Sequence, residues 1–263
     1  MKKIIALIDD QSNREILIDS AVELAKLLNL EVTVCHLVLA PSNWEQLNRV
    51  TREKHPDAKL KINEARFLMD EILREIRMKD VKAKKRYLYY DSTDAKHNFD
   101  FNSDELIVME KKFLNRGQNH ALSDLLFKLE PSKLILCQPL QINAIADIVF
   151  TSNFHDINPE TSNLISELYR YLVFNLNLVF INTKEKQENS EISIKNMKKT
   201  IAANGFSRTG ISIFYSDRKI RGAKQFANMK GGDLIILECS QRISNQELSK
   251  LNLPIIIINK CDD

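Results

Sequence analysis

The sequence predicts an α/β fold built from two tandem domains, each a doubly wound parallel sheet of five strands. The first observation is the opening of the chain. Apolar residues 3–8 and 32–38 are typical of buried strands, and they flank a stretch with the apolar spacing of a helix. A strand–helix–strand unit implies parallel pairing through a right-handed crossover. The second observation is a repeat, because residues 146–153 resemble the opening strand and residues 233–238 nearly repeat residues 105–110.

The spacing of the repeat indicates two domains and shows where the second copy is shorter. Matching positions are separated by 144 residues for Asp9 and Asn153, by 128 for Glu105 and Asp233, and by 120 for Leu134 and Pro254. The second copy has therefore lost residues before its fourth strand and again after it. A period near 140 residues is far longer than that of a solenoid repeat. We expect one domain at 1–141 and a shortened, degenerate one at 145–263.

Local patterns predict the remaining elements of the first copy. Ser12 followed by Glu15 predicts a capping box at the start of the first helix, and Asn29 predicts a left-handed C-cap at its end. The polar segment Pro41–Pro56 is expected to hold a short helix, and its Trp44 is a weak candidate for a partner anchor. The later elements are predicted as a helix at 60–78, strands at 86–90, 106–109 and 134–137, and a helix at 121–129.

The second copy follows the same order with shorter connections. Asn158 before Pro159 predicts a helix start with proline at its first position, and Gly205 predicts the end of a later helix. The predicted strands are 176–181, 211–215, 233–238 and 254–258, and the other predicted helices are 192–204 and 222–229.

Composition limits the functional classes. The 263 residues carry a net charge of +3, which is too balanced to favour nucleic-acid binding, and the basic run at 82–86 is interpreted as a solvated strand start. No segment approaches the ~20 apolar residues of a membrane span, and the apolar start of the chain is too short for a signal peptide. The four cysteines are far apart in the sequence and form no CxxC pair. The sequence therefore predicts a cytoplasmic protein without membrane or nucleic-acid partners.

The stretch 105–125 is the most informative for function. It reads as a buried strand, a loop and a helix start, which is where a doubly wound fold binds a phosphate on a glycine-rich turn. The chain has six glycines, and only Gly117 precedes Gly205. A loop that binds phosphate with its backbone needs glycine at its closest approach. The loop in this chain lacks those glycines.

Four segments together resemble the universal stress protein family in its tandem form. The strand 4–10 ends in the sequence Asp-Asp, residues 21–28 resemble the family's first helix, 32–38 its second strand with a histidine, and 105–109 its Asp-Leu-Ile-Val-Met strand. The order and spacing of these segments carry the resemblance more than any single motif. The resemblance implies a five-stranded sheet of strand order 3-2-1-4-5 with helices on both faces. It also implies that the fifth strands of the two copies pair, forming an intramolecular pseudo-dimer.

The resemblance also implies a nucleotide site that this sequence has largely lost. ATP-binding members hold adenine between strands one and four and phosphates on Gly-x2-Gly-x9-Gly-[Ser/Thr] after strand four. The matching positions are Asp9, which is retained, Leu37 and Met109 near the base, Glu110, Phe113 and Ser123 at the glycines, and Asp124 at the final Ser or Thr. In the second copy Asn153 replaces the aspartate and Glu238 stands at the first glycine.

These replacements favour a non-catalytic protein of the stress response that acts through protein contacts. Side chains at glycine positions block backbone approach, and Glu110 and Asp124 put negative charge where a triphosphate needs positive charge. We expect no enzymatic activity and no cofactor. The alternative is a sensor that binds AMP, ATP or another small ligand through domain 1, using Asp9, Leu37 and Met109. The sequence names no protein partner, and it is compatible with a homodimer.

Two other candidate sites have simpler explanations. Asp9 and Asp10 are acceptable Mg²⁺ ligands, but a strand-end aspartate more often binds a nearby loop amide. His36 is expected to be a strand residue at a sheet end with its hydrogen bonds satisfied, because the five histidines show no paired metal spacing. The sequence also has no P-loop, nucleophile elbow or GxGxxG motif.

Overall fold

The computed structural model describes most of the chain in seven segments. These segments are residues 3–10, 12–90, 105–110, 134–137, 141–183, 190–239 and 252–259. The predicted helix at 121–129 lies outside the described residues, as do the phosphate-loop positions Phe113, Ser123 and Asp124.

The first half of the chain has five strands in the described residues. In chain order its elements are β1 (Lys3–Ile8), α1 (Arg14–Leu28), β2 (Glu31–Leu39), η1 (Trp44–Gln46), α2 (Arg49–Glu53), α3 (Pro56–Met78), β3 (Ala83–Tyr90), β4 (Glu105–Met109) and β5 (Leu134–Cys137). The predicted limits of the first and fifth strands agree with β1 and β5. Asn29 ends α1 in the left-handed conformation, with φ of 52° and ψ of 50°, as its sequence position predicts.

The second half repeats the same order after η3 (Ile142–Ala144). Its elements are β6 (Asp147–Thr151), α5 (Pro159–Tyr171), β7 (Asn175–Asn182), α6 (Ser190–Asn204), β8 (Thr209–Tyr215), α7 (Lys219–Lys230), β9 (Leu234–Cys239) and β10 (Ile255–Asn259). The predicted start of α5 is confirmed, because Asn158 is its N-cap and accepts a hydrogen bond from the Glu160 amide at 2.9 Å.

One predicted helix start is wrong. Ser12 was expected to cap α1, but the N-cap residue is Asn13, and the Asn13 side chain makes no capping hydrogen bond. The Ser12 hydroxyl instead donates to Asp9 Oδ1 at 2.8 Å, so it is already bound to the residue that directly follows β1.

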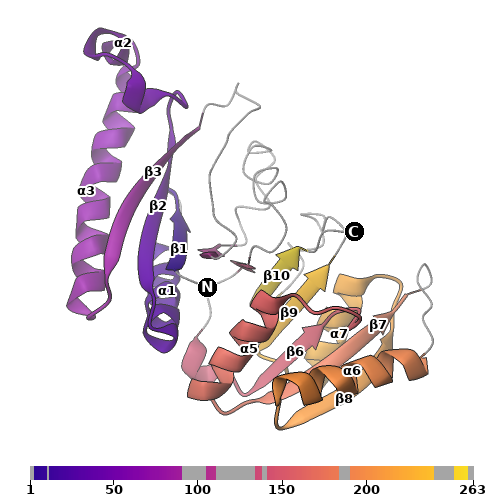
Figure 1. Cartoon of the computed structure of the whole chain (residues 1–263). Coiled ribbons are helices and arrows are strands. Elements are labelled where there is room, and N and C mark those ends of the chain that lie inside the picture. The colour runs from indigo at the N-terminus through magenta and orange to yellow at the C-terminus, as the bar shows by residue number, and fades with distance from the viewer. Residues whose placement is uncertain are drawn as a thin grey trace.

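All ten described strands form one sheet. Its order is β3-β2-β1-β4-β5-β10-β9-β6-β7-β8, so each half has the strand order 3-2-1-4-5 (Figure 1). Every pair within a half is parallel. The doubly wound α/β fold class predicted from the sequence is therefore confirmed.

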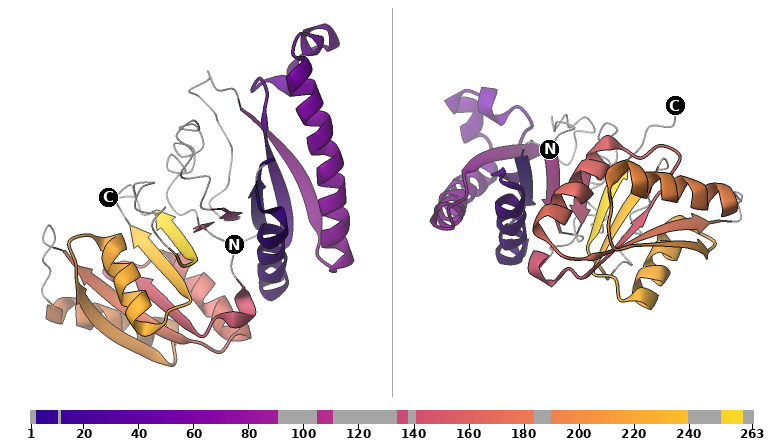
Figure 2. Two further views of the ribbon diagram at one scale, coloured as in Figure 1. Left: turned by 180° about the vertical axis from the view of Figure 1, so that it is seen from behind. Right: turned by 60° about the horizontal axis from the view of Figure 1, so that its bottom comes forward.

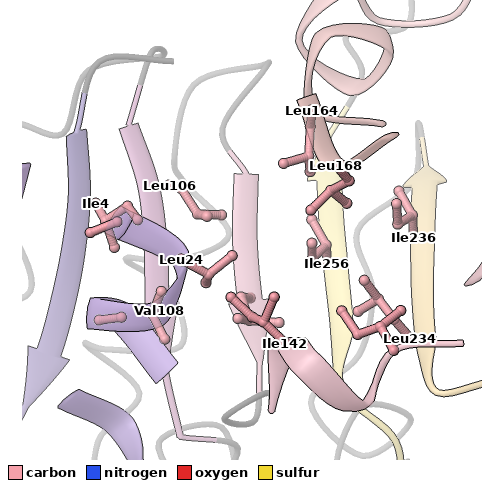
Figure 3. Close-up of a cluster of buried hydrophobic side chains, with 14 of the residues drawn as sticks. Ile4, Leu24, Leu106, Val108, Ile142, Leu164, Leu168, Leu234, Ile236 and Ile256 are labelled. Atoms are coloured by element: carbon pink, nitrogen blue, oxygen red, sulfur yellow. The ribbon is translucent and has the colours of Figure 1, made fainter. Parts of the chain in front are cut away.

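The two halves meet at the antiparallel pair β5 and β10. Ile257 lies opposite Ile135, and Ile256 opposite Leu136. Beneath this pair one hydrophobic cluster runs through both halves, from Ile4 and Leu24 across Ile142 to Leu164 and Leu168 (Figure 3). Helices α1 and α5 also contact each other. The core therefore continues across the junction.

The helices cover the sheet in two layers. Helices α1, α3, α5 and α6 contribute to the cluster on one face, and α7 contributes to the cluster on the other face (Figure 2). This arrangement follows from right-handed crossovers to strands on opposite sides of the first strand. None of the described helices is both long enough and apolar enough to cross a bilayer.

Trp44 belongs to a third, smaller cluster. It is only 3% exposed and packs with residues of β2, β3 and α3, including Val38, Ile62 and Tyr89. The expectation that Trp44 is a partner anchor is therefore wrong, because the indole is already buried against its own chain.

Candidate functional site

The strand order defines where a ligand site would lie. From β1 the chain crosses to β2 on one side, and from β4 it crosses to β5 on the other. In open α/β sheets the carboxyl ends of two such strands border the crevice in which ligands bind. The second half has the equivalent place at the ends of β6 and β9.

Asp9 directly follows β1 at this edge and forms a tight local turn. Its carboxylate Oδ1 accepts the Ser12 hydroxyl hydrogen bond, and its own backbone amide donates to Ser12 Oγ at 3.0 Å. The Ser12 amide in turn donates to the Asp9 carbonyl at 3.1 Å. Asp9 thus binds a loop hydroxyl in the described residues, and the expected bond to a loop amide remains a prediction. Among the described residues, no cluster of three or more His, Cys, Asp or Glu side chains could hold a metal ion.

Glu110 follows β4 and reaches the start of α1. The backbone amide of Asn13, the N-cap residue of α1, donates a hydrogen bond to Glu110 Oε1. These residues are 97 positions apart in the sequence. A carboxylate is favoured there, because the first amides of a helix lack partners and carry partial positive charge. The Glu110 side chain therefore lies at the N-terminal end of α1, where a helix favours an anion.

Leu37 and Met109 lie at the same edge but face the other side of the sheet. Leu37 is 2% exposed and Met109 is fully buried. Both belong to the hydrophobic cluster that includes Ile5, Leu7 and Cys35, not to the cluster under α1. The structure therefore brings Asp9, Leu37, Met109 and Glu110 to one edge, with the two apolar side chains packed into the core.

His36 lacks the hydrogen bonds that were expected for its ring nitrogens. It is fully buried beside the end of β1, but neither ring nitrogen has a hydrogen-bond partner in the part of the chain that the structure describes. Its Nε2 lies 3.4 Å from Asp10 Oδ1, without hydrogen-bond alignment. Burial lowers the pKa of His36 below its ordinary value of 6.5, although Asp10 and Asp9 oppose this shift. The expectation of a satisfied histidine is therefore wrong for the described residues.

In the second half, Glu238 closes the equivalent crevice. Its carboxylate is 1% exposed and accepts three hydrogen bonds, from Ser152 Oγ at 2.7 Å, Thr161 Oγ1 at 2.5 Å and the Asn158 amide at 3.0 Å. Ser152 and Thr161 are themselves buried. Asn158 is the N-cap residue of α5, as Asn13 is of α1. Both halves thus place a glutamate from strand four against the start of the helix after strand one.

Sequence reasoning missed the donors to Glu238. It identified the glutamate only as a replaced glycine, and it did not assign roles to Ser152, Asn158 and Thr161. A signal was present, because each copy has an asparagine directly before the first helix and a glutamate at the end of the fourth strand. Asn153, which stands at the Asp9 position, uses its side-chain oxygen to accept the His155 amide at 3.3 Å.

The comparisons with known proteins define the fold more closely. No family model and no curated protein matches the sequence. Solved structures do match over nearly the whole chain. A universal stress protein from Archaeoglobus fulgidus is 12% identical with a TM-score of 0.67, covering 99% of this chain and 97% of its own. A putative universal stress protein from Pseudomonas aeruginosa is 11% identical with a TM-score of 0.61, covering 98% and 93%.

A third match is a functionally unknown protein from Pseudomonas aeruginosa, 10% identical with a TM-score of 0.59, covering 100% of this chain and 94% of its own. The protein is thus a doubly wound α/β protein with two similar halves. More particularly, it has the fold of universal stress proteins, as the resemblance implied.

Proposed function

We propose that the protein is a non-catalytic, universal-stress-protein-like protein that acts in a stress response through protein contacts. The observation that carries this proposal is the position of Glu110 and Glu238. Each carboxylate accepts the backbone amide of the N-cap residue at the edge where a nucleotide would bind. In this proposal the halves correspond to the subunits of an intramolecular pseudo-dimer, and the protein partner is not yet known.

The electrostatic argument opposes triphosphate binding. A helix N-terminus attracts phosphate through its unpaired amides and its dipole. Here an internal carboxylate already accepts one of those amides in each half. A phosphate that took this place would displace the carboxylate and lie close to its charge. At ~4 Å that repulsion is about 1 kcal/mol in water and about 4 kcal/mol near a protein surface.

The absence of an activity is part of the proposal. A phosphate loop without its glycines would not hold ATP in an orientation for attack. It would also not stabilise the charge that develops in the transition state. We therefore propose that neither half hydrolyses ATP and that the second half binds no nucleotide. The same reasoning leaves the protein without a cofactor.

The alternative function is an adenine-nucleotide or other small-ligand sensor in the first half. The observation in its favour is His36, whose buried nitrogens lack hydrogen-bond partners among the described residues and lie at the same edge as Asp9. A base or ribose could supply such partners. Glu110 is also less buried than Glu238.

Native mass spectrometry of the purified chain with added ATP and AMP tests the two functions. The non-catalytic proposal predicts the bare chain mass in both cases. A 1:1 adduct that disappears in the variant Asp9→Ala would establish the sensor instead. Glu110→Ala is the matched variant, because removal of the internal carboxylate should strengthen any residual phosphate binding in the first half. Phosphate release from ATP by the unmodified chain, above that of Glu110→Lys, would contradict the non-catalytic proposal.

A further inference from the structure

A pocket lies outside the crevice described above. It is a cavity of about 330 Å³ between η1, α2 and the first half of α3, lined by Trp44, Arg49, Arg52, Glu53, Lys59, Ile62, Asn63 and Arg66. Figure 1 places α2 at the end of α3, away from the second half of the chain. The volume is within the range of small-molecule sites, about 300–1,000 Å³.

The lining is strongly cationic. Four side chains are positive and one is negative, so the pocket carries a net charge of +3. Its carboxylate, Glu53, is bound by Arg49 Nε at 3.2 Å, and Arg49 is almost fully exposed at the rim. Lys59 and Arg66 form neither an ion pair nor a side-chain hydrogen bond with any residue that the structure describes. The three remaining cations therefore have no ion-pair partner among the described residues.

Arg52 is held rigidly in this pocket. Its Nε donates to the Trp44 carbonyl at 3.1 Å and its Nη2 to the Glu45 carbonyl at 2.8 Å. Its guanidinium lies over the indole of Trp44, 5.6 Å from the ring centroid. A fixed guanidinium loses little conformational entropy when it binds an anion, and the N–H groups of Nη1 and the second N–H of Nη2 remain as donors for a phosphate group.

The carboxylate of Glu45, next to Trp44 in the chain, binds a residue outside the pocket. Glu45 Oε1 accepts the Tyr89 hydroxyl hydrogen bond at 3.2 Å, on the core side of η1. Burial, assisted by Glu45, raises the pKa of Tyr89 to about 12, so this phenol stays neutral and bound. Glu45 is not part of the pocket lining. The buried Trp44 and Ile62 form an apolar floor beneath the cations.

We propose that this pocket binds a small phosphorylated molecule with two or more negative charges. Arg52 would supply the fixed contact, and Lys59 and Arg66 would approach the same phosphate groups from α3. The site is independent of the crevice at β1 and β4 and needs no nucleotide base.

The test is calorimetric titration of the full chain with pyrophosphate, which has no base for the crevice to recognise. Saturable 1:1 binding is expected. Arg66→Ala and Lys59→Ala should each weaken it about tenfold, the loss of one charge-assisted hydrogen bond. Lys61→Ala is the matched control. It removes the same charge from the same helix, but Lys61 does not line the pocket, so the affinity should change less than twofold.

Trp44 is the only tryptophan, so its emission reports on this pocket without labelling. Pyrophosphate should change the emission in the unmodified chain and in Lys61→Ala, with the midpoint shifted in Arg66→Ala. Absence of binding heat at millimolar pyrophosphate would overturn the proposal. Equal affinity in Arg66→Ala and the unmodified chain would overturn it too, because the ligand would then lie elsewhere. Binding of a phosphopeptide without binding of pyrophosphate or sugar phosphates would also overturn the proposal, because the ligand would then be a protein segment. These outcomes do not depend on whether the crevice at β1 and β4 binds a nucleotide.

Discussion

The internal carboxylate of the second half should be a major source of stability, and Glu238→Ala tests this. The substitution removes the acceptor of three hydrogen bonds while keeping β9 intact. Two of the donors, the hydroxyls of Ser152 and Thr161, are buried and cannot turn to water. The third donor, the Asn158 amide, belongs to the first turn of α5.

The expected magnitude follows from these contacts. Each hydrogen bond to a charged acceptor contributes about 1 kcal/mol or more, so the loss is about 3 kcal/mol in free energy of unfolding. For a chain of this size about 1 kcal/mol corresponds to 2–4 °C in melting temperature. Glu238→Ala should therefore melt about 6–12 °C below the unmodified chain, as measured by circular dichroism.

Two matched variants separate the causes. In Glu238→Gln the amide oxygen can keep the Asn158 and Thr161 hydrogen bonds while the amide nitrogen donates to Ser152 Oγ. This variant should lose only the interaction of charge with the helix, about 1 kcal/mol or less. Glu110→Ala should also cost about 1 kcal/mol, because Glu110 is more exposed and accepts the Asn13 amide. A Glu238→Ala chain that melts within 2 °C of the unmodified one, or no lower than Glu110→Ala, would refute the reasoning.

Three further predictions test other parts of the structure. Because burial lowers the pKa of His36 below 6.5, the unfolded chain binds the proton more tightly, so stability should be highest above pH 6.5 and fall as the pH is lowered. Urea titrations at several pH values should show this slope, and His36→Asn should flatten it; equal slopes would contradict it. Gly222→Ala would place a Cβ 2.6 Å from Ile181 Cγ2. This overpacking should lower the free energy of unfolding by about 1–3 kcal/mol, as measured by urea unfolding. An unchanged urea midpoint would contradict this and show that α7 can shift. A chain ending at residue 141 would expose the β5 edge that β10 covers and should self-associate in light scattering, whereas a monodisperse monomer would contradict this.

Much of the fold could be predicted because its signals are local. The limits of β1 and β5, the left-handed cap at Asn29 and the proline start of α5 each depend on a few neighbouring residues. The order 3-2-1-4-5 came from the family resemblance, and the parallel crossovers came from the alternation of strands and helices. The domain limits of 1–141 and 145–263 remain a prediction.

The errors share a physical cause. Serine is a common helix cap, but Asp9, directly after β1, accepts the hydrogen bond of the Ser12 hydroxyl. Trp44 stands in a polar segment, yet β2, β3 and α3 surround it. In both cases a local pattern allows two outcomes, and the neighbouring elements select one of them.

The sequence by itself determined the order of elements, the repeat and the presence of a glutamate at positions 110 and 238. These properties depend on residue type and on spacing within one element. Only the tertiary structure decided that each glutamate binds the start of a helix far away in the chain, 97 residues for Asn13 and 80 for Asn158. It also decided that Arg52, Lys59 and Arg66 line one pocket. The physical reason is that such contacts depend on how the strands are ordered and how the helices cross them, and no local window of sequence contains that information.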